Sequence, residues 1–233
     1  MDGTHSLPEF VTHRRGAKTV LAHPDYEEKV TGALFDGAGC VSADLAGRGG
    51  LQRFEYGGGT GLVRRYFRGG LVRHFLRETY LFQDRAAREL ALQRYAYEHE
   101  VPVAMPLGII SERRGPFFRG AIAFEELTGG DLLAYLSAEH DDAAAISAKC
   151  GQAIWRMHDA GIFHADLQIR NIFVGSNGIY LLDFDKARRL EALDETQRRT
   201  NLARLRRSFL KREASLAFFD ALQEAYDRES SEA

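Results

Sequence analysis

The pattern of apolar and polar positions predicts a chain rich in strands in its first half and in helices in its second. Residues 45–67 hold two glycine clusters, each followed by an apolar–polar alternation, which predicts a hairpin of two strands with glycine turns. Residues 101–127 predict two more strands around a polar turn at Arg113–Gly115. Residues 75–100 have apolar positions at helical spacing, typical of one or two helices. The first stretch, to about Cys40, is mixed and favours no single element.

The second half has a helical pattern that is interrupted by one small hairpin. A short helix is expected after Asp131, which is a candidate N-cap, and a longer helix over residues 143–161 ends at a glycine. Two short strands, residues 171–175 and 178–184, follow, and from about Leu190 the pattern is helical and amphipathic. This order is an α+β pattern with a β-rich front and a helical back. A cleft between two such halves is a common place for a ligand.

The composition limits the classes of protein to which the chain can belong. With 233 residues, of which 45% are hydrophobic, it is long enough for one large or two-lobed domain with a substantial core. A formal net charge of −2 argues against a general nucleic-acid-binding protein, so no nucleic-acid partner is expected. The cysteines, Cys40 and Cys150, have no motif spacing, so neither a disulfide framework nor a zinc site is expected.

The charge is unevenly placed along the chain. Residues 62–77 and 198–212 are locally basic, and such segments are usually solvated helix faces but can also meet phosphates or an anionic membrane. The N-terminus shows no signal-peptide pattern, and no apolar run is long enough to span a bilayer. We therefore expect that any work at a membrane is done from its surface.

Polar residues with phosphoryl-transfer chemistry gather in the segment FHADLQIRNIFV, residues 163–174. Asp166 and Asn171 lie five residues apart between a helix and a strand, and Asp183 ends the next strand, which would bring it close to Asn171. An amide and a carboxylate oxygen suit Mg²⁺, and Asp166 would remain to orient a hydroxyl and accept its proton. Taken singly, each residue is more simply explained as a cap, a turn residue or a packing residue. Their combination favours the chemistry.

These residues resemble the catalytic loop of the protein-kinase-like superfamily, whose pattern is H-R-D-x-x-x-x-N followed by D-F-G. The matching residues are His164-Ala165-Asp166, Asn171 and Asp183-Phe184-Asp185. The resemblance implies a single two-lobed domain of residues 1–233, with a small β-rich N-lobe (about 1–127) and a reduced helical C-lobe (about 128–233). It also implies that Asp166 is the catalytic base, that Asn171 and Asp183 bind Mg²⁺, and that His164 anchors the loop.

The departures from the superfamily pattern narrow the substrate class. Ala165 replaces the Arg that reads a phosphorylated activation loop, Gln168 stands where Ser/Thr-type kinases carry a Lys, and Asp185 replaces the Gly. About fifty residues follow Asp185, and no A-P-E motif is present among them. A protein kinase needs more chain than this for its peptide-docking helices, so a small-molecule or lipid-linked acceptor fits better.

The front half should supply the ATP site. The segment GRGG resembles a reduced glycine-rich loop whose backbone could approach phosphates, although the cluster at residues 57–61, which we assign to a hairpin turn, is equally rich in glycine. The loop residues expected to bind the nucleotide are Gly47, Gly49 and Gly50.

The cation that grips the phosphates should come from the following strand, LVRRYF. The strand has no Lys, and alternation allows only one of Arg64 and Arg65 to face the cleft; register against the superfamily favours Arg64. Glu89 is the expected ion-pair partner of that Arg. Backbone groups of Glu125–Leu127 would meet adenine, and Asp131 would touch the ribose or, as we favour, cap its helix.

The wider pattern, from about Gly47 to Lys211, resembles the 3-deoxy-D-manno-octulosonic acid (Kdo) kinase family of lipopolysaccharide-core kinases. The segments that carry the likeness are RRYFRGGLVRHF, ETYLF…RELAL, VPVAMPLG, MHDAGIFHADLQIRNIF, LLDFDKARR and NLARLRRSFLK. The resemblance implies transfer of the ATP γ-phosphate, with Mg²⁺, to the 4-hydroxyl of Kdo on a lipid A precursor. It further implies a peripheral protein on the cytoplasmic face of the inner membrane. No obligate protein partner is inferred.

That resemblance gives the basic segments two possible roles. Arg68, Arg73 and the Arg204–Arg207 region could hold an anionic substrate, and the segment LARLRRSFL could lie on an anionic bilayer, although a helix packed on its own lobe is the more common explanation. Two alternatives stay open: another phosphotransferase of the same fold, acting on a heptose, choline or an aminoglycoside, and a nucleotide-binding pseudokinase. The complete catalytic set argues against the pseudokinase, while the missing Lys argues mildly for it.

Overall fold

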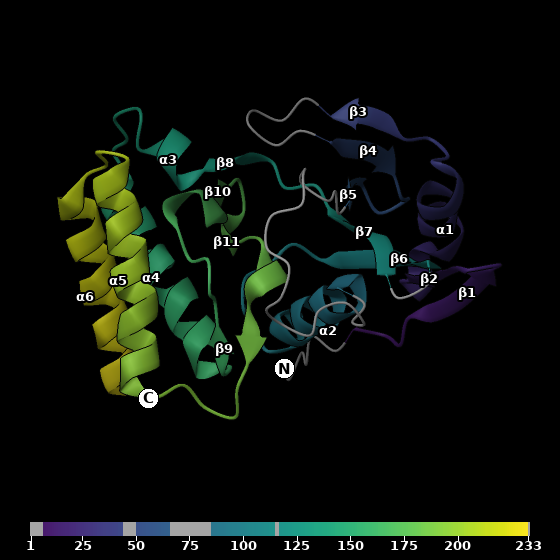
Figure 1. The fold of residues 1–233 in the computed structure, drawn as a ribbon. Helices are drawn as coiled ribbons and strands as arrows, with labels where there is room; N and C mark the ends of the chain where they lie inside the picture. Colours follow the sequence, from purple (N-terminus) through teal and green to yellow (C-terminus); the bar gives the residue numbers. More distant parts are fainter. Residues whose placement is uncertain (1–6, 44–49, 66–84, 115–116, 233) are drawn as a thin grey trace, which may run out of the picture. The chain divides into compact units, whose positions relative to one another are not determined.

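The computed structural model describes residues 7–43, 50–65, 85–114 and 117–232 (Figure 1). The chain forms two compact units. The sheet unit consists of Leu7–Ala91 and Met105–Glu126, and the helical unit contains Leu92–Ala104 and the chain from Leu127 onward. We describe each unit by itself.

An antiparallel sheet is the framework of the sheet unit. Its strands lie in the order β1-β2-β6-β7-β5-β4-β3, and every neighbouring pair is antiparallel. The bounds are β1 (Val11–Arg15), β2 (Lys18–Ala22), β3 (Val41–Ala43), β4 (Leu51–Glu55), β5 (Thr60–Arg65), β6 (Pro106–Arg114) and β7 (Phe117–Glu125). The hairpins expected around residues 57–61 and 113–115 are thereby confirmed as the β4–β5 and β6–β7 pairs.

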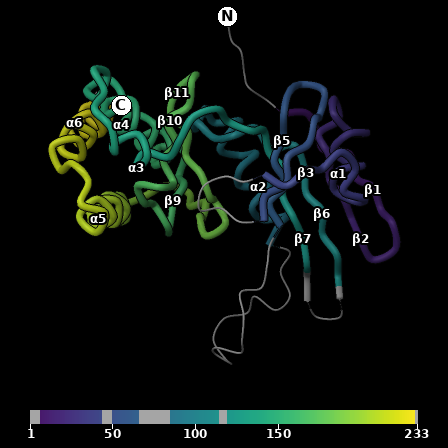
Figure 2. Tube along the Cα trace, turned by 90° about the horizontal axis from the view of Figure 1, so that it is seen from above, coloured from purple at the N-terminus to yellow at the C-terminus, as the bar shows by residue number. Residues whose placement is uncertain are grey.

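Helices cover both faces of this sheet. Helix α1 (Glu27–Asp36), which follows the short helix η1 (Pro24–Tyr26), packs Val30 against a cluster that includes Val63 and Ala121. The first turns of α2 (Arg85–Glu98) place Leu90 in another cluster, with Ile122. Consecutive residues of β7 point to opposite faces, so Ala121 and Ile122 mark the two sides of the sheet. Figure 2 shows α1 and α2 on opposite sides of these strands.

The helical unit holds a small set of strands among the later turns of α2 and four further helices. The helices are α3 (Leu132–Tyr135), α4 (Ala143–Asp159), α5 (Glu195–Lys211) and α6 (Leu216–Glu232), with the short helices η3 (Ile169–Asn171) and η4 (Phe184–Lys186). The strands are β8 (Gly129–Asp131), β9 (Ile162–Phe163), β10 (Ile172–Gly175), β11 (Gly178–Leu181) and β12 (Arg188–Arg189). They form the antiparallel sheet β11-β10-β8 and the pair β12-β9.

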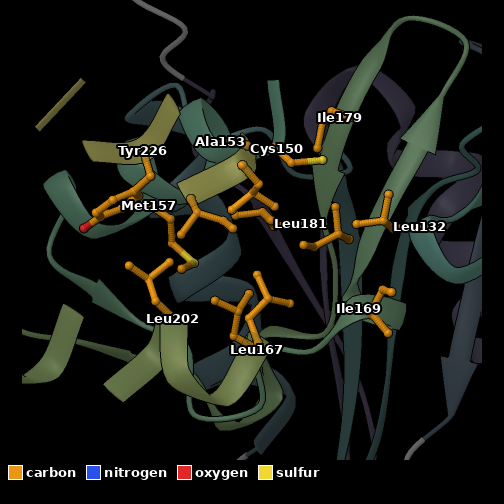
Figure 3. Packing of buried hydrophobic residues seen from close by; sticks show 14 of the residues in the cluster. Leu132, Cys150, Ala153, Met157, Leu167, Ile169, Ile179, Leu181, Leu202 and Tyr226 are labelled. Carbon is orange, nitrogen blue, oxygen red and sulfur yellow. The ribbon is translucent and has the colours of Figure 1, made fainter. Parts of the chain in front are cut away.

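The core of this unit lies between α4, α6 and the β10–β11 hairpin (Figure 3). At Gly151 the helices α4 and α6 approach so closely that a Cβ atom would lie 2.4 Å from the carbonyl oxygen of Leu222. Leu167 and Ile169, in the segment before β10, are buried in the same core. The burial of Leu167 and Ile169 therefore fixes this segment, together with its neighbouring polar residues, against the core.

Several local expectations are confirmed. Asp131 caps α3, because its Oδ1 accepts a hydrogen bond from the backbone N of Ala134 at 2.9 Å. Gly161 follows α4 with a φ of 72°, a left-handed conformation that suits glycine. The stretch before Cys40, for which the sequence favoured no single element, forms β1, β2, η1 and α1. Of residues 75–100, where one or two helices were expected, the structure describes residues 85–100.

Candidate active site

His164 fixes the segment between β9 and β10. Its side chain is fully buried; Nδ1 lies 3.2 Å from the backbone N of Asp166, and Nε2 lies 3.0 Å from the backbone O of Leu182. Nδ1 can accept from the Asp166 N–H only when it carries no proton, so Nε2 carries the hydrogen and donates to Leu182. Burial lowers the pKa of His164, which keeps this neutral tautomer. The geometry agrees with the expected role of His164 as an anchor.

Asp166 and Asn171 are tied together across the loop. The Asn171 Nδ2 donates to the backbone O of Asp166 at 2.9 Å, so its amide oxygen is the atom that remains for a cation or a water. The Asp166 side chain is 31% exposed, and the Lys186 ammonium lies 3.6 Å from its Oδ2. Asp166 is thus accessible to an acceptor hydroxyl and has a positive charge beside it. Sequence analysis did not predict the contact with Lys186.

Asp183 is brought to the same loop by strand pairing. In the β10–β11 hairpin Ile172 pairs with Leu181, and the backbone N of Leu182 donates to the backbone O of Asn171 at 2.8 Å. Asp183, the next residue, has φ 64° and ψ 67°, a left-handed conformation that costs a non-glycine residue about 1 kcal/mol or more. Strain held by the surrounding structure is typical of functional sites.

The donor set at this hairpin fits a magnesium ion. An amide oxygen from Asn171 and a carboxylate from Asp183 are hard oxygen ligands, and Mg²⁺ commonly takes one or two protein ligands while water and phosphate complete its shell. In the described ranges, no group of three or more His, Cys, Asp or Glu side chains forms a metal site. Asn171 and Asp183 are the residues that could hold such a cation.

A buried polar network connects the loop to the helices behind it. Asn201 of α5 accepts at Oδ1 from the backbone N of His164 at 3.0 Å and lies 3.2 Å from Nε2 of His158, whose Nδ1 is 2.9 Å from the Tyr226 hydroxyl. The backbone N–H of His164 fixes the Asn201 amide orientation, so His158 Nε2 must donate and the Tyr226 hydroxyl must donate to Nδ1. Burial lowers the pKa of His158 to about 4, which keeps the ring neutral.

A second residue of α5 holds the other end of the loop. The Ser208 hydroxyl accepts from the backbone N of Ile169 at 2.9 Å. Sequence analysis missed both Asn201 and Ser208. One signal was present, because these polar residues lie seven apart on the same helical stripe as the buried Leu202, Leu205 and Phe209.

In the sheet unit, the predicted pair between Arg64 and Glu89 forms. The guanidinium of Arg64 on β5 hydrogen-bonds the carboxylate of Glu89 on α2, which is 4% exposed. Arg65 instead places its Nε 3.2 Å from Oε1 of Gln52 on β4. The two arginines lie on opposite faces, as alternation requires, and Arg64 lies on the face that α2 covers.

The expected nucleotide loop is described only in part. Gly47 and Gly49 lie outside the described residues, while Gly50 has a φ of 84°, which glycine tolerates. The antiparallel pairing of β3 with β4 shows that this glycine cluster connects two strands. The cluster at residues 57–61 forms the β4–β5 turn, as we assigned it.

The segment expected to meet adenine has partly committed its hydrogen bonds. The backbone N of Glu125 donates to the O of Met105 at 3.0 Å, and that of Glu126 donates to the O of Thr60 at 2.8 Å. The Glu126 carboxylate also accepts from Nε of Arg53 at 2.6 Å. These two backbone N–H groups already donate hydrogen bonds within the sheet unit. The expected contact with adenine would therefore have to come from other backbone groups of residues 125–127.

Comparison with known proteins identifies the family. Residues 37–226 match the model of the "Lipopolysaccharide kinase (Kdo/WaaP) family". The chain belongs to this family. Its members named 3-deoxy-D-manno-octulosonic acid kinase include a protein of Xanthomonas axonopodis pv. citri, 32% identical over 223 residues (90% of this chain and 87% of the relative). One of Xylella fastidiosa is 34% identical over 193 residues (78% and 76%).

A solved structure agrees on the fold of the chain. The chain titled "WaaP in complex with acyl carrier protein" matches with a TM-score of 0.57 and 20% identity, over 84% of this chain and 80% of that one. The expected α+β, kinase-like class with a β-rich N-terminal part and a helical C-terminal part is thereby confirmed. The expected membership of a lipopolysaccharide-core kinase family, and hence an enzyme that phosphorylates a hydroxyl, is also confirmed.

Proposed function

We propose that this protein transfers the γ-phosphate of ATP to the 4-hydroxyl of a Kdo residue on a lipid A precursor, in lipopolysaccharide core biosynthesis. The observation that carries the proposal is the likeness to Kdo kinases along most of both chains. The segment that positions His164, Asp166, Asn171 and Asp183 also supports the proposal, because these residues supply the groups that phosphoryl transfer needs.

In this proposal Asp166 accepts the proton of the attacking hydroxyl, for which its partly exposed carboxylate is suited. Asn171 and Asp183 would hold Mg²⁺, which supplies neutralisation of phosphate charge when it is bound. Lys186 adds positive charge beside the acceptor, and His164 keeps the loop in place.

The sheet unit would bind the triphosphate. Arg64 is placed to grip the phosphates, Glu89 holds its guanidinium, and the backbone of Gly47, Gly49 and Gly50 would approach the nucleotide. We further propose that the two units work as the lobes of one domain of residues 1–233.

The lipid acceptor also sets the proposed location. The enzyme would work as a peripheral protein at the cytoplasmic face of the inner membrane, without nucleic acid and without an obligate protein partner. No helix in the described ranges is long and apolar enough to cross a bilayer.

The test is to incubate the purified protein with Mg·ATP and a Kdo-bearing lipid A precursor and to look for one added phosphate on Kdo by mass spectrometry. Asp166→Asn should lower kcat by roughly 10²–10⁴-fold, since it removes the base, and should leave ATP binding intact. Normal turnover of Asp166→Asn would reject Asp166 as the base. Absence of product with the wild type would direct the work to heptose, choline and aminoglycoside acceptors, and failure with all of these would favour a pseudokinase.

A further inference from the structure

Helix α5 presents two faces with different chemistry. Its inner face buries Leu202, Leu205 and Phe209, and it holds the catalytic loop through Asn201 and Ser208. Apart from Leu210, the large apolar residues of the segment LARLRRSFL therefore pack inside the protein. This corrects the idea that the segment LARLRRSFL lies on a membrane by its apolar side.

The outer face of α5 is basic along its length. The exposed charged residues of this face, which we call the basic face, are Arg199, Arg204, Arg206, Arg207 and Lys211. At 100° per residue Arg204, Arg207 and Lys211 fall on the side opposite the buried stripe, and Arg199 and Arg206 lie on its flank. The sequence from Arg199 to Arg212 contains no Asp or Glu. Glu195, at the start of the helix, pairs with Arg199 at 2.7 Å and leaves the later cations without an acidic residue on their own helix.

The neighbouring helix shows that this charge is specific to α5. The exposed charged residues of α6 include Asp220, Glu224 and Asp227 beside Arg228. Solvated helix faces usually mix both signs. A helix whose charged residues after Arg199 are all cations, packed beside one with mostly acids, is instead suited to an anionic partner.

We propose that the basic face of α5 binds the anionic headgroups of a phospholipid membrane. A helix of 17 residues is about 25 Å long, and like charges spread over that length match an extended plane of phosphates better than a compact protein surface. Leu210, 49% exposed, is the large apolar side chain on this side, so the contact is electrostatic rather than inserted. Binding should therefore weaken strongly with salt.

The two faces of α5 give such docking a consequence for catalysis. Since the inner face holds the loop through Asn201 and Ser208, the basic face lies about one helix diameter, roughly 10 Å, from that loop. A membrane on the basic face would hold a lipid-borne sugar at about that distance from the loop. This step rests on the proposed function, whereas the docking itself does not.

The test uses the full chain without ATP, in flotation with vesicles of phosphatidylglycerol and phosphatidylethanolamine or of phosphatidylcholine alone. Arg204→Gln, Arg207→Gln and Lys211→Gln together should lower partitioning to the anionic vesicles on the order of a hundredfold, about fivefold per residue. The matched control combines Lys149→Gln, Arg156→Gln and Arg228→Gln, three exposed cations of α4 and α6 with the same charge change. It should bind like the wild type, and the difference should vanish at high salt.

An equal loss of vesicle binding in both triple variants would mean that binding depends only on the net charge of the protein. That result would overturn the proposal. Vesicle binding by the α5 variant at the level of the wild type would overturn it too, and would point to an acidic protein as the partner of the basic face. A deacylated, soluble Kdo acceptor, offered to the wild type, tests the proposed function separately from vesicle binding. If the wild type fails on that acceptor while vesicle binding still depends on α5, the proposed function is wrong and the docking surface stands.

Discussion

At the residue scale, Arg64 and Arg65 form a natural pair for a test, since they are neighbours on opposite faces of β5. Arg64→Ala should raise the KM for ATP by about tenfold, because one charge-assisted contact to phosphate is lost. Arg65→Ala should change it little. Steady-state kinetics of the two variants test this prediction. A larger rise of the KM for ATP in Arg65→Ala than in Arg64→Ala would place the phosphate contact on the other face of β5.

A second variant separates nucleotide binding from stability. Arg64→Ala leaves the buried Glu89 carboxylate without this cation, which is expected to cost about 3–5 kcal/mol of folding stability. Adding Glu89→Gln should restore most of the unfolding midpoint but not the affinity for ATP. Recovery of both would mean that Arg64 acts only through folding.

The sequence revealed those residues of the site whose relation is local. Asp166 and Asn171 share one loop, and Asp183 follows from the pairing of two adjacent strands. Lys186 and Asn201 were missed because their contacts depend on how η4 and α5 pack on the loop, 20 and more residues along the chain. No local pattern encodes a contact of that kind.

At the element scale, α5 acts as a brace for the catalytic loop. Asn201→Ala would leave the buried N–H of His164 and Nε2 of His158 without their acceptor, at about 1–3 kcal/mol each, and should lower kcat about tenfold by loosening the loop. Hydrogen exchange of residues 163–171 should rise in parallel.

Two further variants test whether Asn201 affects kcat by positioning the loop rather than by stabilising the fold in general. Asn201→Asp keeps an acceptor in place and should recover most of kcat. Ser147→Ala removes a buried hydrogen bond within α4, to the O of Ala144, and should leave kcat alone. An equal fall of kcat in Ser147→Ala would reduce Asn201 to an ordinary stabilising residue.

The elements that sequence analysis did not resolve have weak patterns for a physical reason. Strand β1 lies at the edge of the sheet and has no fully buried residue, so its sequence VTHRR lacks a clear alternation. Helix α1 buries Val30 and Leu34 on a sheet face that only the folded strands create. Hairpins and long helices were predictable, because period and turn residues specify them locally.

At the scale of the whole molecule, the buried histidines link folding to pH. Burial lowers the pKa of His158 to about 4, helped by Arg198 and His164 and opposed by the hydrogen bond to Asn201. The unfolded chain takes up a proton near pH 6.5 and the folded one does not, so the stability is complete above that pH and falls as the pH drops towards 4. The loss from His158 should be about 3 kcal/mol.

Urea titrations at pH 7 and pH 4.5 measure this loss. His158→Gln removes the titrating group, so its stability should depend less on pH across the same interval than that of the wild type. Equal dependence in the two proteins would assign the acid sensitivity to carboxylates instead.

The fixed direction of donation from Tyr226 through His158 to Asn201 makes the loop observable in solution. His158 and His164 should both give ¹⁵N resonances of a neutral ring protonated at Nε2, unchanged across ordinary assay conditions. A ring that began to titrate near 6.5 would reveal a loop that had opened to water. The two imidazoles thus serve as built-in spectroscopic reporters of whether the phosphoryl-transfer machinery is assembled, before any substrate is added.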